Sequence, residues 1–276
     1  MSASERQSLM IDVEQDTIEL SIRFWGNGPS ILCLHGLMHS SEIWMRVTKL
    51  LEHEFQIIAL DLPGFGLSPP LPASQINLVK YARIIRAALD TLSKDYEISA
   101  IVADSLSTRI VSQACELGLD SSLTRVLLSG CPFDGLPLLL RIFPVSFFMK
   151  PTLWLLKVLP TSLSIAIIGL FARYTVHDKS TAGTEISYGV LHTDPTTAQR
   201  MFDGLKEPIS VSAANCLGRY KCVLLRGKFD RVESHSSLSA WARKLSATYV
   251  ELSMSGHTPM IEEPANYAQT IRDLMR

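Results

Sequence analysis

Short apolar runs alternate with longer amphipathic segments in the first half of the chain. The runs 31–34, 55–60 and 98–103 are each bounded by turn or polar residues, which is typical of buried parallel strands. Between them, segments 40–53 and 75–93 carry apolar residues at helical spacing. Such alternation of strands and helices favours a parallel sheet with helices on both faces.

Strand and helix signals also occur before residue 31 and near the C-terminus. Two early strands are predicted before the first buried run, and alternating elements return near the C-terminus after a long interruption. The remaining predicted segments, in chain order, are strands 9–13 and 17–25, helix 106–117, strand 124–128, strand 223–225, helix 235–245, strand 248–252 and helix 265–275.

The interruption predicts an inserted unit. From about 133 to 219 the chain shows helical patterns broken by prolines, with no convincing strand. We therefore expect a helical cap, residues 134–219, inserted into a core domain made of residues 1–133 and 220–276. The expected fold class of the core is α/β, with a mostly parallel eight-stranded sheet flanked by helices.

The most lipophilic stretch, 136–172, lies within the predicted cap. Prolines and basic residues interrupt it, and its longest charge-free run, 158–172, contains Pro160. A membrane-spanning helix needs about 20 predominantly apolar residues, so none is predicted here. The pattern leaves an interfacial segment open, and with it a peripheral membrane contact through the cap.

Composition narrows the classes of partner and compartment. The formal net charge is −1 and the basic residues are scattered, which argues against nucleic-acid binding. The five cysteines form no Cys-x-x-Cys pair, and they favour a reducing compartment, with pairing of Cys216 and Cys222 left open. The first residues lack the apolar core of a signal peptide. A cytoplasmic location is expected, with no metal or organic cofactor, because no metal-ligand spacing or phosphate-binding glycine loop occurs.

Ser105 is the strongest candidate for chemistry. It follows the predicted strand 98–103 and precedes the predicted helix 106–117. Small residues, Ala103 and Ser107, stand two positions away on either side. A nucleophile on a sharp strand-to-helix turn needs such neighbours, because bulky ones would collide across the turn.

Alternative registers of this turn fit less well. With Asp104 as the nucleophile, the residues two positions away would be Val102 and Leu106, which are too large. With Ser107 in that role, one such neighbour would be Arg109. The steric requirement therefore selects the intervening serine.

His257 and Asp230 are the candidate base and acid. A serine hydroxyl is a poor nucleophile without a base, and His257 follows a predicted strand and precedes a predicted helix. Asp230 follows the strand 223–225 and would fix the tautomer of the imidazole and stabilise the imidazolium. Glu233 is the fallback acid.

Together these residues resemble the α/β-hydrolase superfamily, with its chain order of serine, acid and histidine. The elbow departs from the family pattern, because Ala103 and Ser107 stand where glycines are usual. The resemblance covers nearly the whole chain, and it is carried by 34–37 (Leu-His-Gly-Leu), 61–68 (Asp-Leu-Pro-Gly-Phe-Gly-Leu-Ser), the Ser105 elbow, Gly227 with Asp230, and Gly256–His257 with Pro259, Glu262 and Pro264.

The resemblance implies further roles. It implies that the backbone N–H groups of Leu37 and Leu106 form an oxyanion hole, and that His35 has a structural role. It also implies that the Asp61 loop shapes the rim of the site. Backbone donors place no demand on side-chain identity, so the residues themselves do not test the oxyanion hole.

The apolar residues of the cap have three interpretations. They line an acyl-binding pocket over Ser105, they pack the cap onto the sheet domain, or part of their surface contacts a membrane. Lys150, Lys157 and Arg173 are compatible with the last of these. The candidate substrate-binding residues are His39, Phe143, Phe147 and Trp154.

The sequence thus predicts a serine hydrolase acting on a small hydrophobic molecule. We expect an ester or thioester with a hydrophobic acyl or alcohol part to be cleaved through an acyl-enzyme. One alternative is a carbon–carbon bond hydrolase or lyase using the same three residues, since fold and triad do not separate these chemistries. Another is a ligand-binding receptor with slow turnover. The sequence does not indicate an oligomeric state.

Overall fold

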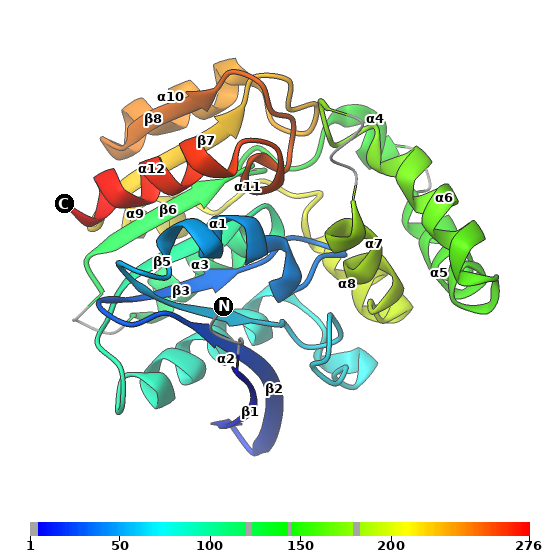
Figure 1. The fold of residues 1–276 in the computed structure, drawn as a ribbon, viewed down its shortest axis with the longest axis horizontal. Coiled ribbons are helices and arrows are strands. Elements are labelled where there is room, and N and C mark those ends of the chain that lie inside the picture. The colour runs from blue at the N-terminus through cyan, green and yellow to red at the C-terminus, as the bar shows by residue number, and fades with distance from the viewer. Residues whose placement is uncertain (1–4, 120–122, 143–144, 179–182) are drawn as a thin grey trace.

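A single eight-stranded sheet forms the centre of the protein. The computed structural model describes residues 5–119, 123–142, 145–178 and 183–276. The strand order is β1-β2-β4-β3-β5-β6-β7-β8 (Figure 1). The strands are β1 (Glu5–Val13), β2 (Asp16–Trp25), β3 (Ser30–Leu34), β4 (Gln56–Leu60), β5 (Ile98–Asp104), β6 (Arg125–Ser129), β7 (Lys221–Gly227) and β8 (Thr248–Leu252).

The sheet is parallel from β4 onward and antiparallel at one edge. Strands β1 and β2 pair antiparallel, and β2 pairs antiparallel with β4. Every other neighbouring pair is parallel. The predicted fold class, a mostly parallel eight-stranded α/β sheet, is therefore confirmed.

The alternation of side chains along each strand divides the core into two layers. In β3, Leu32 and Leu34 belong to one buried apolar cluster, whereas Ile31 and Cys33 belong to the other. The first cluster includes residues of α2 (Leu78–Leu92), α3 (Leu106–Leu117), α9 (Val211–Leu217) and α10 (His235–Leu245). The second includes residues of α1 (Met45–Leu51), α11 (Pro259–Glu262) and α12 (Pro264–Met275).

The predicted helix 40–53 is two elements in the structure. Ser40 accepts a hydrogen bond from Glu42 N and begins the 3₁₀ helix η1 (Ser41–Trp44), which leads into α1. A second 3₁₀ helix, η2 (Ala73–Gln75), precedes α2. Asn77 caps α2 by accepting a hydrogen bond from Lys80 N at 2.9 Å.

The interrupted region folds into helices between β6 and β7. Helices α5 and α6 lie at the right-hand edge of Figure 1, with α7 and α8 between them and the sheet. Helix α9, at the end of the region, packs against α3. The 134–219 cap stays a prediction, and the packing of α9 favours a cap that ends earlier. The helices of this region that precede α9 are α4 (Leu138–Ile142), α5 (Val145–Val158), α6 (Thr161–Ala172), α7 (Thr184–Leu191) and α8 (Pro195–Gly204).

None of the helices in the described segments combines the length and apolar character that a membrane crossing requires.

The loop after β4 is organised by one buried carboxylate. Asp61 Oδ1 accepts a hydrogen bond from Ser41 N at 2.6 Å, and Oδ2 accepts one from Leu67 N at 3.1 Å. Gly66, at φ +57°, lies so close that an added Cβ would overlap the Asp61 carboxyl group. At the same edge of the sheet, His35 Nε2 accepts a hydrogen bond from Leu62 N at 3.0 Å. The loops after β3 and β4 are thus joined into one unit.

Replacing Asp61 with alanine should destabilise this loop and the protein. Two buried N–H donors would lose a charged acceptor, which lowers the free energy of unfolding by about 2 kcal/mol. Urea denaturation followed by circular dichroism measures the change. Asp90→Ala is the control, because the Asp90 side chain is 57% exposed and its ion pair with Arg86 spans 3.9 Å. Equal stability of the two variants would contradict this account.

Candidate active site

Ser105 occupies a strained turn between β5 and α3. Its φ and ψ angles are +47° and −108°, a combination that residues other than glycine rarely adopt. The turn is held because Ser105 N donates a hydrogen bond to Ser129 O at 2.8 Å, and Thr108 N donates one to Ser105 O at 3.0 Å. Ser105 is 8% exposed, so only a small part of it reaches the surface.

The two small neighbours are fully buried, as the turn requires. Ala103 and Ser107 are both 0% exposed. Ser107 also donates a hydrogen bond from its Oγ to His35 O at 2.5 Å, which fastens α3 to the loop after β3. A serine at this position therefore adds a contact that glycine would lack.

The structure brings the three predicted site residues into one hydrogen-bonded chain. Ser105 Oγ lies 3.0 Å from His257 Nε2, and His257 Nδ1 lies 2.9 Å from Asp230 Oδ2. The other Asp230 oxygen accepts hydrogen bonds from Val232 N at 2.7 Å and Glu233 N at 3.1 Å. Asp230 is thereby fixed, and its free oxygen is directed at the imidazole.

Charge and burial act against each other at this pair. Burial raises the pKa of Asp230, but the charge and hydrogen bond of His257 and the two backbone donors hold that pKa below its ordinary value. Burial likewise lowers the pKa of His257. The charge and hydrogen bond of Asp230 outweigh this, with help from Asp104 and Glu233, and raise the pKa of His257 to about 9.

Glu233, the fallback acid, takes a different position. The described structure pairs His257 with Asp230, and Glu233 lies beyond it with its N–H bonded to the Asp230 carboxylate. Burial raises the pKa of Glu233 to about 8, with the neighbouring Asp230 charge adding to the effect. Glu233 is therefore mostly uncharged at neutral pH.

The chain around Gly36 lies close against Ser105. A Cβ at Gly36 would stand 3.1 Å from Ser105 Cβ and 2.7 Å from Asp104 Oδ2. Leu37 follows directly and lines the cavity above Ser105. Leu106 is the first residue of α3, and the first N–H groups of a helix have no partner within it. This arrangement is compatible with the predicted backbone donors.

The carboxylate of Asp104 is buried beside Ser105. From the sequence, this residue is considered only as a rival nucleophile. Asp104 is 0% exposed, and its Oδ1 accepts a hydrogen bond from Ser129 Oγ at 3.0 Å. Its Oδ2 lies 3.8 Å from His39 Nδ1, and neither atom has a hydrogen-bond partner within the described residues. Asp104 thus contributes negative charge behind the site.

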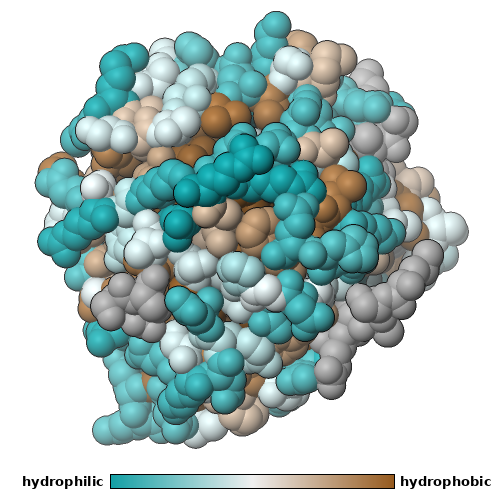
Figure 2. Space-filling view, turned by 60° about the vertical axis from the view of Figure 1, so that its left-hand side comes forward, coloured by the Kyte–Doolittle hydropathy of each residue, from teal (hydrophilic) through white to brown (hydrophobic). Residues whose placement is uncertain are grey.

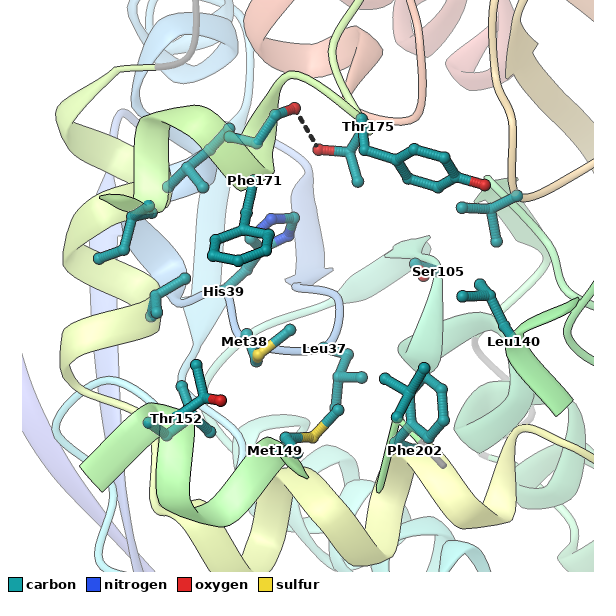
Figure 3. Close-up of a pocket in the computed structure, with 18 of the residues that line it drawn as sticks. Leu37, Met38, His39, Ser105, Leu140, Met149, Thr152, Phe171, Thr175 and Phe202 are labelled. Carbon is teal, nitrogen blue, oxygen red and sulfur yellow. Dashed lines mark hydrogen bonds between the residues drawn. The ribbon is translucent and has the colours of Figure 1, made fainter. Parts of the chain in front are cut away.

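An apolar cavity of about 580 Å³ opens above Ser105. This volume lies within the range of small-molecule sites. In Figure 3, Leu140 and Phe202 stand on one side of the open space, and Phe171 and His39 on the other. Side chains of α5, α6 and α8 supply much of the wall, among them Met149, Leu153, Leu156, Ile168, Phe171 and Phe202.

The predicted pocket residues are placed differently. His39 lines the cavity, and Phe143 lies outside the described residues. Phe147 and Trp154 are a correction to the prediction, because they lie outside the cavity and are 70% and 63% exposed. On α5 the side chains of 149, 153 and 156 face inward, so at 100° per residue positions 147 and 154 fall on the opposite side.

Most of the residues that line the cavity were not predicted from the sequence, because the orientation of α5 and α6 decides which of their apolar residues face Ser105. Leucine, isoleucine, phenylalanine and methionine occur on every side of α5 and α6, so the spacing of apolar residues did not reveal which side faces Ser105. Within the described segments, no group of three or more His, Cys, Asp or Glu side chains is placed to hold a metal ion. All five cysteines are buried and unpaired.

Comparison with known proteins identifies relatives of this fold. Residues 29–264 match the family model described as alpha/beta hydrolase fold. The chain is similar to a thermophilic esterase from Thermogutta terrifontis, with a TM-score of 0.78 and 18% identity, covering 99% of this chain and 98% of that one. It is also similar to an esterase from Exiguobacterium antarcticum, with a TM-score of 0.76 and 14% identity over 97% and 98% of the two chains.

Curated relatives match shorter segments. A pimeloyl-[acyl-carrier protein] methyl ester esterase from Vibrio vulnificus is 27% identical over 82 residues, which are 30% of this chain and 32% of that protein. An uncharacterized protein from Mycobacterium bovis is 36% identical over 93 residues, which are 34% of this chain and 26% of that protein. The chain therefore spans about a quarter to a third of the length of these relatives.

Replacing Asp230 with asparagine should lower the pKa of His257. The wild-type imidazole has a pKa of about 9, because the Asp230 charge outweighs the effect of burial. Without that charge, burial lowers the pKa with only weak opposition from the other groups. We expect a value below the ordinary one of about 6.5. The chemical shift of the His257 Cε1–Hε1 pair, followed by NMR against pH, measures the change.

Glu233→Gln is the matched control, because Glu233 acts on the imidazole from farther away and is the smallest of the causes that raise the pKa of His257. It should move the pKa of His257 far less. Equal shifts in the two variants, or none in Asp230→Asn, would show that Asp230 is not the partner of the imidazole.

Proposed function

The chain belongs to the alpha/beta hydrolase fold family, and on that premise we propose that it is a serine hydrolase that cleaves an ester or thioester. The observation that carries the proposal is the relay from Ser105 Oγ through His257, 3.0 Å away, to Asp230, 2.9 Å farther on. Base and nucleophile within hydrogen-bond reach, with the base oriented by an acid, are the requirement for an activated serine.

In the proposed first step, Ser105 Oγ attacks the carbonyl carbon of the substrate while His257 Nε2 accepts its proton. Asp230 stabilises the imidazolium that forms. The backbone N–H groups of Leu37 and Leu106 donate hydrogen bonds to the developing oxyanion. Since only uncharged His257 accepts a proton, activity should rise with pH toward about 9.

The intermediate then collapses. His257 gives its proton to the departing alcohol or thiol, which leaves the acyl group on Ser105. In the second half of the reaction, His257 removes a proton from water, and the resulting hydroxide attacks the acyl carbonyl. Loss of Ser105 as the leaving group, reprotonated by His257, regenerates the free enzyme.

A hydrophobic acyl or alcohol part is supported by the cavity. Its wall is formed mainly by aliphatic and aromatic side chains, and Ser105 and His257 are among its few polar members. Relatives whose names state an ester as substrate support the same class of bond. On this proposal the helices α4 to α8 select the substrate, since they build the wall facing Ser105.

A fluorophosphonate probe should label one site, and Ser105→Ala should abolish the labelling. The probe reacts with a serine only when a base activates it. Intact-mass spectrometry measures the adduct, and hydrolysis of a 4-nitrophenyl ester by the variant should fall by about 10⁴-fold or more. Ser112→Ala is the control, since this buried serine lies on α3, the helix that follows Ser105, and its Oγ donates a hydrogen bond to Thr108 O.

Loss of labelling in both variants would indicate a folding defect, which thermal unfolding of each variant detects. If the folded wild-type protein takes up no probe and cleaves no activated ester, the proposal fails, and a ligand-binding role takes precedence.

Catalytic efficiency should rise with acyl chain length. Each methylene group that enters the cavity is stabilised by about 0.8 kcal/mol, so kcat/KM should increase by up to about fourfold per methylene until the cavity is filled. A series of 4-nitrophenyl esters from acetate upward measures this. Phe202→Ala removes part of the cavity wall and enlarges the cavity, so it should shift the preferred acyl chain length upward. A series that falls from acetate onward would contradict a hydrophobic acyl site.

A further inference from the structure

Two cap helices present an apolar surface to solvent. Helices α5 and α6 lie side by side at the edge of the molecule (Figure 1), and α6 carries no charged residue. A surface helix normally has a polar side, and one that is apolar all round is buried or faces lipid. The outer hairpin face consists of side chains that are 42% to 64% exposed, namely Trp154, Leu155, Val158, Leu163, Ile165 and Leu170.

Other parts of the surface are different in kind. Figure 2 brings forward the side of the molecule that carries β8, α10 and α12, and hydrophilic residues dominate that side. Apolar side chains appear there only in small groups. The exposed apolar side chains on α5 and α6 therefore form a patch that the side of the molecule shown in Figure 2 does not have.

The charge of this region has one sign. Between residues 135 and 177 the sequence contains no aspartate or glutamate, whereas it contains Arg141, Lys150, Lys157 and Arg173. Lys157 and Arg173 are exposed and border the outer hairpin face, and within the described residues neither takes part in an ion pair. An apolar surface with a wholly basic fringe is complementary to an anionic lipid surface.

The outer hairpin face continues into the cavity above Ser105. Phe148, Phe171 and Tyr174 line that cavity and are also 57%, 65% and 46% exposed. In Figure 3 Phe171 stands beside His39, across the space from Leu140 and Phe202. These side chains form the mouth of the cavity, so an apolar chain can pass between hairpin and cavity without crossing a polar rim.

We propose that the outer hairpin face binds the surface of an anionic phospholipid bilayer, and that the substrates are lipid esters that enter the cavity from it. The second half of this statement rests on the proposed function, whereas the first half does not. A second copy of the chain fits less well, because a two-fold contact would bring the same basic residues together without acidic partners.

The helices lie on the bilayer and do not cross it. Helix α6 spans Thr161–Ala172, 12 residues, which is too short for the hydrocarbon core. Buried side chains such as Leu156 and Ile168 hold the hairpin on the protein, so the outer side chains reach only the headgroup and upper acyl region.

Binding is tested with the full chain and sucrose-loaded vesicles. Vesicles of phosphatidylcholine and phosphatidylglycerol in equal parts should sediment the protein, and phosphatidylcholine alone should do so more weakly. Trp154 reports contact, because it is 63% exposed, whereas Trp25 and Trp44 are 8% and 1% exposed and the half-buried Trp241 is held on α10 by a hydrogen bond to Asp134. Its emission should shift to shorter wavelength on anionic vesicles, and Trp154→Phe should remove the shift while sedimentation persists.

Variants separate the apolar and electrostatic parts. Val158→Ser, Leu163→Ser and Leu170→Ser combined should weaken partitioning by about 100-fold, since only the exposed half of each apolar side chain can enter the bilayer and, on substitution, lose contact with it. Lys157→Gln with Arg173→Gln should weaken it by about 30-fold, at about a factor of five per charge, and high salt should have a similar effect. As a matched control, Lys94→Gln with Lys244→Gln removes two charges far along the sequence from the hairpin and should change nothing.

Activity assays then test delivery. The triple serine variant should keep hydrolysis of a soluble short-chain ester, because none of its three positions lines the cavity, and should lose at least about tenfold on a long-chain ester carried in vesicles. The proposal that the outer hairpin face binds a bilayer is wrong if the wild-type protein does not sediment with anionic vesicles. It is also wrong if sedimentation velocity shows that the protein dimerises through the hairpin. Vesicle binding without any ester cleavage would leave the surface standing and reject the proposed function alone.

Discussion

The strained turn at Ser105 is the constraint on which the rest of the site depends. A positive φ at a residue with a side chain costs about 1–3 kcal/mol and persists only where the surroundings over-determine it. Here the surroundings are β6, which accepts the Ser105 N–H, and α3, whose Ser107 hydroxyl is bonded to the loop after β3. At Gly36 that loop passes so close to Ser105 that an added Cβ would stand 3.1 Å from the Ser105 Cβ. No larger residue therefore fits at position 36, which keeps the space beside the Ser105 hydroxyl narrow.

The electrostatic arrangement follows from burial of several acids around one histidine. Asp230 contacts the His257 imidazole directly, while Asp104 and Glu233 act on it from farther away, and all three raise its pKa. Burial opposes the ionisation of Glu233, so this acid adds its full charge to the site only as the pH rises past about 8. Below that pH the imidazole releases its proton more readily than it would beside an ionised Glu233.

The layers of the fold could be predicted from the sequence because they rest on local signals, and the structure brings the three predicted polar residues within hydrogen-bond distance of one another. The helix limits 106–117 and 235–245 are those observed, since one helix begins directly after the Ser105 turn and the other after Ser234, an extended residue that caps it. Five predicted strands are one to four residues shorter than observed, because polar end residues such as Ser8 and Lys221 pair in the sheet all the same. The predicted strand 55–60 begins one residue early, 124–128 is displaced by one residue, and 248–252 matches β8. The cavity wall was not predictable, because which side of an all-apolar helix faces inward depends on tertiary packing. Asp104 was missed as a source of charge since its importance arises only from burial beside His39.

The chain that follows α6 is attached to the His257 loop through backbone hydrogen bonds, which connects the outer surface of the α5–α6 hairpin with the cavity above Ser105. His257 N donates a hydrogen bond to Thr175 O at 2.6 Å, directly after the last turn of α6. Glu262 then accepts hydrogen bonds from His177 N at 2.6 Å and from Gly256 N at 2.8 Å, so one carboxylate holds the end of the hairpin and the loop of His257 together. A Cβ at Gly256 would overlap Thr175 O, which keeps this junction tight. Any force that fixes α6 from outside therefore also fixes the position of His257, and the α5–α6 hairpin both forms part of the cavity wall and supports the loop of this histidine.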